Sequence, residues 1–250
     1  MTQRQLIAKL SKLAQLRSSD DVFVYITGDK KPPELFGAVI ASDVIPILDK
    51  HLYKSGKKKK ISMMLYSSGG NLESPWPIVS LFREYTDDFE VIVPFKAHSA
   101  ATLICLGADS VVMTPLSYLS PIDPRGEFKE GNSSKGFQVE DISSYVDFAK
   151  TKIGISEQTA LTEVMKLLCQ EIQPSKLGSI NRTHSLIRML AEKLLKTHKR
   201  PLQPHHIKSL IEHLTEKLFS HNHLINRAEA KDIGFGKLIK DASSQEEKLI

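Results

Sequence analysis

The chain has 250 residues, of which 41% are hydrophobic and 25% are charged, and its formal net charge at pH 7 is +5. This composition is typical of a globular protein with a sizeable core and excludes a largely disordered chain. No uninterrupted apolar run is long enough to span a bilayer, so the sequence predicts no transmembrane segment.

The positive charge does not by itself indicate a nucleic-acid-binding protein, because lysines and arginines are spread along the chain instead of gathered in one motif. One dense run occurs, from Lys57 to Lys60. We interpret it as a solvated turn before an apolar strand, and a patch for phosphate or an acidic partner is the alternative. We expect no nucleic-acid partner.

Residues 1–18 carry apolar side chains at helical spacing with charges between them, which predicts an amphipathic helix and not a signal peptide. Cys105 and Cys169 each stand in an apolar helical pattern. This placement indicates buried thiols in a reducing compartment instead of a disulfide framework. We therefore expect a cytoplasmic protein.

Between residues 19 and 114, predicted strands alternate with predicted helices. Apolar, β-branched segments predict strands at 22–28, 61–66, 89–95 and 111–114, and helices are predicted at 43–53, 71–85 and 99–109. Strands alternating with helices of about a dozen residues imply right-handed β-α-β crossovers. The predicted fold class is therefore α/β, with a mostly parallel sheet.

The second half of the chain reads as helical apart from one polar segment. Residues 123–136 lose hydrophobic periodicity and gain glycine, serine and charge, which predicts a surface loop. Helices are predicted at 139–152, 157–173, 174–197 and 204–220, and the last residues are expected to fray. This gives an N-terminal helix (1–18), an α/β core (19–173), a helical C-terminal region (174–242) and a tail (243–250).

Two predicted strand ends carry residues that could perform chemistry. YSSGGN (66–71) has paired glycines, whose backbone N–H groups can approach a substrate closely. KAHSAAT (96–102) places Ser99 among small residues where a strand passes into a helix. A serine there can be a helix cap or a nucleophile; its position downstream of Gly69 and Gly70, at the matching strand end, favours the nucleophile.

Four stretches together resemble the Clp/crotonase-fold serine peptidases, and among them the serine dehydrogenase proteinase (SDH) group related to signal peptide peptidase A. YSSGGN resembles the group's His-Thr-Pro-Gly-Gly-Asp segment, and VPFKAHSAATLICLGADSVVM (93–113) its nucleophile stretch. LSPIDPR (119–125) is similar to its Gly-Pro-Ile-Asp-Pro turn, and SHNHLINRAEAKDIGF (220–235) to its C-terminal segment. With the strands between them, these stretches cover most of residues 20–240.

The resemblance implies that Ser99 is the nucleophile, with Gly69, Gly70 and Ala100 around the oxyanion hole. Two departures concern this neighbourhood: Ser67 and Ser68 replace the usual Thr-Pro or Ser-Pro, and Ala101 replaces a glycine. A third concerns the base. Where Clp peptidases carry a catalytic histidine, this chain has residues 119–123 and no histidine.

The motifs therefore leave the identity of the general base open. Related peptidases use a lysine whose pKa is lowered by burial, some tens of residues after the serine, which makes Lys129 and Lys135 candidates. Both lie in the predicted polar loop, and an exposed lysine without chemical function is the alternative for each. Asp123 is a third candidate, as an acid or as a structural turn residue before Pro124.

The remaining candidates concern substrate contacts and cofactors. Ser68, Trp76 and His98 are candidates to line the substrate groove, with core packing as the alternative for Trp76 and simple packing for His98. The histidines between 205 and 223 lack zinc-ligand spacing, so we interpret them as a solvated or interface face. We expect no metal and no organic cofactor.

The sequence thus predicts a serine hydrolase, most simply a peptidase that acts on a peptide or protein through an acyl-enzyme on Ser99, working without ATP or fed by a partner ATPase. The resemblance also implies a homo-oligomer. A catalytically inactive scaffold of the same fold, binding peptide or protein, is the alternative. An acyl-CoA enzyme ranks last, because that chemistry needs no serine at this position.

Overall fold

The computed structural model describes residues 2–28, 38–122, 125–130, 133–218, 220 and 222–250. The chain divides into two compact units. Unit 1 comprises Met1–Ile122 and Leu190–Ile250, and unit 2 comprises Asp123–Met189. The bounds expected for the α/β core (19–173) and the helical region (174–242) stay predictions, and each unit is described by itself.

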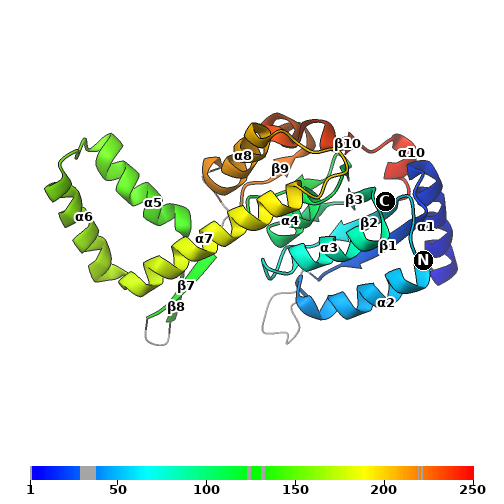
Figure 1. Cartoon of the computed structure of the whole chain (residues 1–250), viewed down its shortest axis with the longest axis horizontal. Helices are drawn as coiled ribbons and strands as arrows, with labels where there is room; N and C mark the ends of the chain where they lie inside the picture. Colours follow the sequence, from blue (N-terminus) through cyan, green and yellow to red (C-terminus); the bar gives the residue numbers. More distant parts are fainter. Residues whose placement is uncertain (1, 29–37, 123–124, 131–132, 219, 221) are drawn as a thin grey trace. The chain divides into compact units, whose positions relative to one another are not determined.

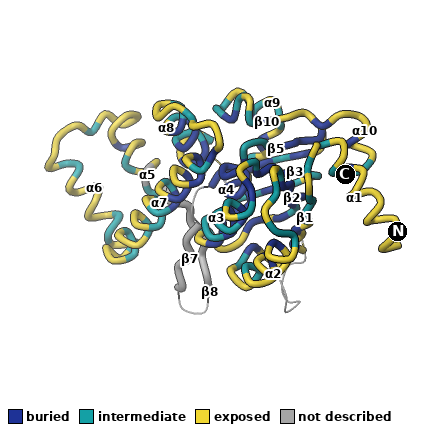
Figure 2. Tube along the Cα trace, turned by 45° about the vertical axis from the view of Figure 1, so that its right-hand side comes forward, coloured by how far each residue is buried: buried dark blue, intermediate teal, exposed yellow. Residues whose placement is uncertain are grey.

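Unit 1 is built on a five-stranded sheet whose strand order is β1-β2-β3-β5-β10 (Figure 1; β5 is labelled in Figure 2). Every neighbouring pair in it is parallel. The strands are β1 (Asp21–Ile26), β2 (Ile61–Tyr66), β3 (Phe89–Val93), β5 (Ser110–Met113) and β10 (Ile239–Asp241). The predicted α/β class with a mostly parallel sheet is therefore confirmed.

Helices cover both faces of this sheet, as a parallel sheet requires. On one face, Leu13 of α1 (Gln3–Arg17) packs with Met64, Ile92 and Val112 of the central strands. On the other, Phe82 of α3 (Pro75–Tyr85) contacts the ring of Phe89 at 4.9 Å between centroids. Figure 2 shows the central strands as the most deeply buried part of the chain.

The connecting helices lie close to their predicted positions. A short 3-10 turn η1 (Ser42–Val44) leads into α2 (Ile45–Ser55). The helix predicted from residue 71 begins only at Pro75, because proline is tolerated in the first turn of a helix but not in its interior. The helix after Ser99, α4 (Ala100–Leu106), is shorter than predicted. All its residues are buried, so it forms part of the core beneath the strand ends.

A small second sheet has the order β4-β6-β9, with β4 (Lys96–Ala97) parallel to β6 (Tyr118–Leu119) and β6 antiparallel to β9 (Ile225–Asn226). An isolated parallel bridge between Ser67 and Ala97 joins the end of β2 to it. The sequence did not predict these strands, because two residues are too few to display a periodicity.

The C-terminal part of unit 1 departs from the helical region expected over 174–242. It contains the helical segments α8 (Pro204–Glu212), η3 (His213–Lys217), α9 (Arg227–Ala230), η4 (Lys231–Phe235) and η5 (Gly236–Leu238), but also β9 and β10. The mostly helical character predicted for this region is confirmed, but β9 and β10 were not predicted, because β10 obtains its backbone hydrogen bonds from β5, more than a hundred residues earlier.

The last residues also differ from expectation, since they form α10 (Ser244–Glu247) instead of fraying. Ser243 caps this helix in a capping box with Glu246. Glu246 is buried and pairs with Arg17, and Leu249 and Ile250 pack on the Leu13 cluster. The sequence contained the capping-box pattern, but the ion pair with Arg17 arises only in the fold.

Unit 2 contains β7 (Arg125–Glu130), β8 (Ser133–Gln138), α5 (Val139–Asp147), the π-helical η2 (Phe148–Lys152), α6 (Gln158–Glu171) and the greater part of α7 (Pro174–Leu195). The helices confirm those predicted here. The polar segment 123–136 was predicted as a loop, and this was wrong for its described part, because β7 and β8 pair antiparallel. The sequence of this hairpin lacks the apolar alternation that predicts a strand.

Candidate active site

The two strand-end motifs singled out in the sequence lie side by side. The Ser67 N–H donates to the Lys96 carbonyl at 3.0 Å, and the His98 N–H donates to the Ser67 carbonyl at 3.1 Å. A Cβ placed on Gly69 would lie 3.0 Å from Ser99 Cβ and 2.9 Å from the His98 carbonyl oxygen. Gly69, at φ +105°, therefore permits a close approach that a side chain would block.

Ser99 adopts a backbone conformation rare for a residue with a side chain, with φ 51° and ψ −113°. Strained backbone of this kind costs about 1–3 kcal/mol and concentrates at functional sites. Ser99 precedes α4, yet its side chain makes no capping hydrogen bond. The helix-cap interpretation is therefore wrong, and the side chain is left for another role.

Two backbone donors in the paired turns, the N–H groups of Ala100 and Gly70, have no acceptor among the described residues. Ala100 is the first residue of α4, so its N–H lacks an intrahelical acceptor. The Gly70 N–H likewise makes no hydrogen bond within the described residues, whereas the Gly69 N–H donates to Ser67 Oγ at 3.0 Å. Of the two glycines, Gly70 is therefore the one whose N–H is available to a ligand.

Gly70 is locked in place by the segment before α2. Ile40 donates its N–H to the Gly69 carbonyl at 2.9 Å, and the Asn71 N–H donates to the Ile40 carbonyl at 2.8 Å. A Cβ on Gly70 would lie 2.2 Å from the Ile40 carbonyl oxygen. The turn that orients the Gly70 N–H thus depends on glycine at this position.

Ser120 holds the backbone of Ser99, a contact that the sequence did not reveal. Its Oγ accepts the Ser99 N–H at 2.8 Å and donates to the Pro121 carbonyl at 3.0 Å. Thr102 supports it, because Thr102 Oγ1 accepts the Ser120 N–H at 3.2 Å. Ser120 lies in the stretch where the resembled peptidases carry a histidine, but here it anchors the main chain of the turn.

Ser67 and Thr27 form a second buried pair behind the glycines, with their hydroxyl oxygens 2.8 Å apart. Ser67 Oγ also accepts the Gly69 N–H. This pair was missed as well, since Thr27 and Ser67 are 40 positions apart and only the parallel pairing of β1 with β2 brings them together.

The candidate lysines belong to unit 2, whereas Ser99 belongs to unit 1. Lys129 lies in β7 opposite Ser134, and Lys135 lies in β8 opposite Phe128, both in unit 2. Their side chains and the whole of Asp123 lie outside the part of the chain that the structure describes. Among the described residues, no side chain forms a hydrogen bond with Ser99 Oγ.

The three candidates for substrate contacts occupy different environments. Ser68 is exposed and His98 is half-buried, and both flank the paired turns. Trp76, on α3, lies 5.3 Å from Lys193 Nζ on α7, measured to the ring centroid. It is half-buried and lines a surface hollow that includes neither glycine of the turn nor Ser99, so its role as a substrate contact stays a prediction.

An exposed aromatic group beside the turn was not anticipated. Phe95 is 45% exposed and stacks on Tyr66 with ring centroids 6.2 Å apart. Tyr118 meets Phe95 edge-on at 6.4 Å, and Lys96 Nζ lies 5.5 Å from the Tyr66 ring centroid. Tyr66 ends β2, Phe95 follows β3, and Tyr118 begins β6 opposite Lys96 of β4.

Neither cysteine forms a disulfide: Cys105 is fully buried in α4, and Cys169 on α6 is only half-buried. Burial raises the pKa of the Cys105 thiol far above its ordinary value. Within the described residues, no group of three His, Cys, Asp or Glu side chains could hold a metal ion, and no helix is long and apolar enough to cross a membrane.

Comparisons with known proteins leave the family open. No protein-family model matches the chain. An uncharacterized protein of Methanocaldococcus jannaschii, MJ0137, is 24% identical over 179 residues, which is 71% of this chain. The chain spans about half the length of that relative, 53% of which is matched.

Among solved structures, similar ones include ClpP1 from Listeria monocytogenes, with a TM-score of 0.47, 16% identity and coverage of 93% of this chain and 96% of that one. The ClpP protease catalytic domain from Plasmodium falciparum has a TM-score of 0.47 and 12% identity, covering 97% and 93%. At these values neither likeness bears on activity.

Proposed function

We propose that this protein is a serine hydrolase, and most simply a peptidase, that uses Ser99 as its nucleophile. The observation that carries the proposal is a pair of backbone donors without an acceptor among the described residues: the Ala100 N–H, next to the strained Ser99, and the N–H of Gly70, which follows the glycine that closely approaches Ser99. Donors held in this way stabilise the negative charge that develops on a carbonyl oxygen under attack. The sequence resemblance to the SDH group supports the same role.

In the proposed reaction, Ser99 Oγ bonds to the carbonyl carbon of a peptide while the carbonyl oxygen takes negative charge and accepts from Gly70 and Ala100. The hydroxyl proton passes to a base and from it to the departing amine as the C–N bond breaks. Water then hydrolyses the resulting ester, releasing the acid and restoring Ser99. Lys129, Lys135 and Asp123 remain the proposed bases, and no metal or organic cofactor takes part.

The exposed aromatic group gives the proposed site a surface for substrate. Phe95, Tyr66 and Tyr118 can contact an apolar side chain of an extended peptide whose carbonyl lies at Ser99. A homo-oligomer in the cytoplasm, working without ATP or supplied by a partner ATPase, is part of the proposal and rests on the sequence resemblance.

The test is labelling with a fluorophosphonate probe, followed by intact-mass measurement of wild type, Ser99→Ala and Ser11→Ala. Ser11 is an exposed serine on α1, so its removal is the matched control. We expect one adduct on wild type and on Ser11→Ala, and none on Ser99→Ala. An adduct that persists on folded Ser99→Ala would refute the assignment of the nucleophile.

A catalytically inactive scaffold that binds peptide is the second candidate. It is favoured by one observation: no described side chain contacts Ser99 Oγ as a base would, and Ser120 serves the backbone instead. The same experiment separates the two functions. The scaffold would be supported if folded wild-type protein takes no label but binds a fluorescent peptide, as measured by fluorescence anisotropy.

A further inference from the structure

A second pocket in unit 1 lies at the opposite end of the sheet from Ser99. Its volume is about 510 Å³, and it is found where β2, β3 and β5 begin. Most of its thirteen lining residues are charged. The cationic side chains are Arg17, Lys60, Lys199, Arg200, Lys237 and Lys240, and the acidic ones are Asp88, Glu90 and Asp109.

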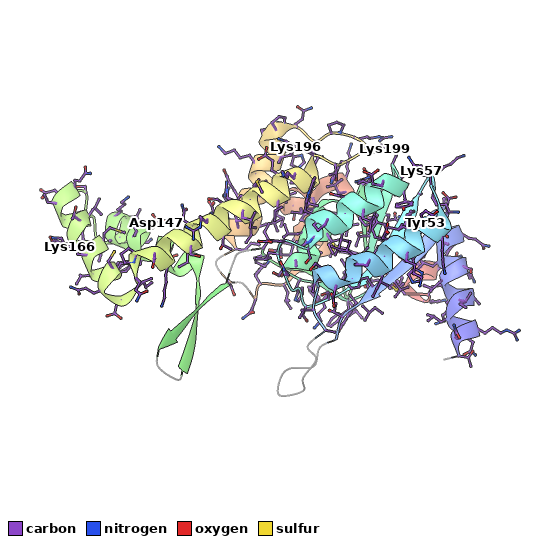
Figure 3. The ribbon with its side chains drawn as sticks, turned by 60° about the horizontal axis from the view of Figure 1, so that its bottom comes forward. Tyr53, Lys57, Asp147, Lys166, Lys196 and Lys199 are labelled. Carbon is purple, nitrogen blue, oxygen red and sulfur yellow. The ribbon has the colours of Figure 1, made fainter. Side chains whose placement is uncertain are left out.

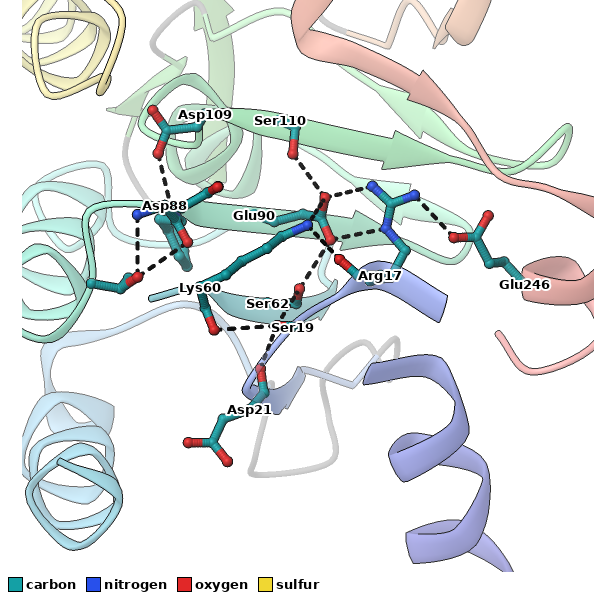
Figure 4. Close-up of polar contacts among 12 residues, drawn as sticks. Arg17, Ser19, Asp21, Lys60, Ser62, Asp88, Glu90, Asp109, Ser110 and Glu246 are labelled. Carbon is teal, nitrogen blue, oxygen red and sulfur yellow. Dashed lines mark hydrogen bonds and ion pairs between the residues drawn. The ribbon is translucent and has the colours of Figure 1, made fainter. Parts of the chain in front are cut away.

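Two of the three acids are already neutralised within the fold. Glu90, whose side chain is fully buried, accepts from Arg17 at 2.6 Å and from Lys60 at 3.0 Å (Figure 4). Asp109 accepts from Arg83 at 2.5 Å and from the Lys199 backbone N–H at 2.6 Å. Asp88 is the third acid, and its carboxylate has no partner among the described residues.

Four of the six cations do not neutralise an acid of the pocket. Lys199, Arg200, Lys237 and Lys240 are exposed, and none of them forms an ion pair with a described residue. Figure 3 shows Lys199 at the surface beyond the end of α7. Four cations around one hollow repel one another, and a bound anion relieves that repulsion.

The backbones of three of these cations, Lys199, Lys237 and Lys240, are held by the fold. The Lys199 N–H is held by Asp109, which also accepts the Phe89 N–H at 2.9 Å at the start of β3. Lys240 lies in β10 opposite Val112 of β5, and Lys237 lies in the 3-10 turn that precedes β10. Only the ends of the side chains must become ordered when a ligand binds, which reduces the entropic cost of binding.

We propose that this pocket binds an oligophosphate, a chain of two or more linked phosphate groups, either free or as part of a nucleotide. Four cations on two backbone segments suit several adjacent negative charges better than a single one, and a guanidinium such as that of Arg200 binds phosphate in a bidentate manner. Leu202 and Leu238 add an apolar wall that an attached base could contact.

The test is isothermal titration calorimetry at physiological ionic strength with inorganic tripolyphosphate, ATP and orthophosphate, in the absence of magnesium. The variants are Lys237→Gln/Lys240→Gln and Lys199→Gln/Arg200→Gln. Lys50→Gln, an exposed lysine on α2 outside the pocket, is the matched control. Because all the altered residues are exposed, thermal unfolding midpoints should stay close to wild type, and this is checked first.

We expect tripolyphosphate to bind more tightly than orthophosphate, with each double variant weakening it about tenfold or more, since charge-assisted contacts are lost. Tighter binding of ATP than of tripolyphosphate would identify a nucleotide, whereas equal binding would identify the phosphate chain alone. No binding of tripolyphosphate or ATP, or an equal loss in Lys50→Gln, would overturn the proposal. The readout is binding, so it does not depend on the activity of Ser99.

Discussion

The carboxylate of Glu90, on β3, links this strand to α1, β2 and β5. Its replacement tests how much these contacts stabilise the fold. The side chain is completely buried and accepts hydrogen bonds from Arg17, Lys60, Ser62 and Ser110. Glu90→Gln keeps the shape of the side chain but removes the charge. It also turns an NH2 group toward donors, so at least one of them loses its acceptor.

The magnitude follows from the contacts. Removing one member of a buried ion pair costs about 3–5 kcal/mol, because the remaining charge is left buried without compensation. Arg17 retains its contact with Glu246 at 2.9 Å, and the side chains of Arg17 and Lys60 are 16% and 17% exposed. We therefore expect a loss near the lower end, about 3 kcal/mol in the free energy of unfolding at pH 7.

The same pair predicts a pH dependence. Burial alone would raise the pKa of Glu90, but the hydrogen bonds and charges of Arg17 and Lys60 outweigh it and lower the pKa below its ordinary 4.5. A carboxyl group whose native pKa is lowered stabilises the fold above its unfolded-state pKa and loses that contribution as the pH falls through the native value. Wild type and Glu90→Gln should therefore converge in stability as the pH falls below about 4.5.

The measurement is urea unfolding followed by tryptophan fluorescence. Trp76 is the single tryptophan and lies in unit 1, so the signal reports the unit that contains Glu90. Glu192→Gln is the control, because Glu192 pairs with Lys196 at the surface and such pairs contribute about 1 kcal/mol or less. A loss for Glu90→Gln no larger than the control's, or a loss that does not shrink in acid, would refute the reasoning.

Three further predictions concern the candidate site and the thiols. Gly70→Ala should destabilise unit 1 by about 1–3 kcal/mol and abolish fluorophosphonate labelling, because the added Cβ would clash with the carbonyl of Ile40. Unchanged labelling, measured by intact mass, would contradict this prediction. Ser120→Ala should slow labelling at unchanged probe concentration, since it removes the acceptor of the nucleophile's N–H, and a wild-type labelling rate would count against a positioning role. Iodoacetamide should alkylate Cys169 and spare the buried Cys105 until urea unfolds the chain, as peptide mapping will check; early modification of Cys105 would show that α4 opens.

The sequence by itself determined the class of the fold and the meeting of its two strand-end motifs. Apolar β-branched segments alternating with helical periodicity predicted parallel strands, because both signals are local and extend over several residues. Parallel strands end at the same edge of a sheet, so Gly69 and Ser99 could be expected to lie close together before any contact was known.

Only the tertiary structure decided the finer arrangement. The contact of Ser120 with the Ser99 N–H, the strand β10, and the gathering of Lys199 and Lys240 around one pocket all join segments far apart in the chain. Such contacts leave no period in the sequence, because each depends on a single side chain or on three residues of backbone. Because lysines and arginines are spread along the sequence, their pattern indicated no binding surface. The fold brings four of them to one pocket.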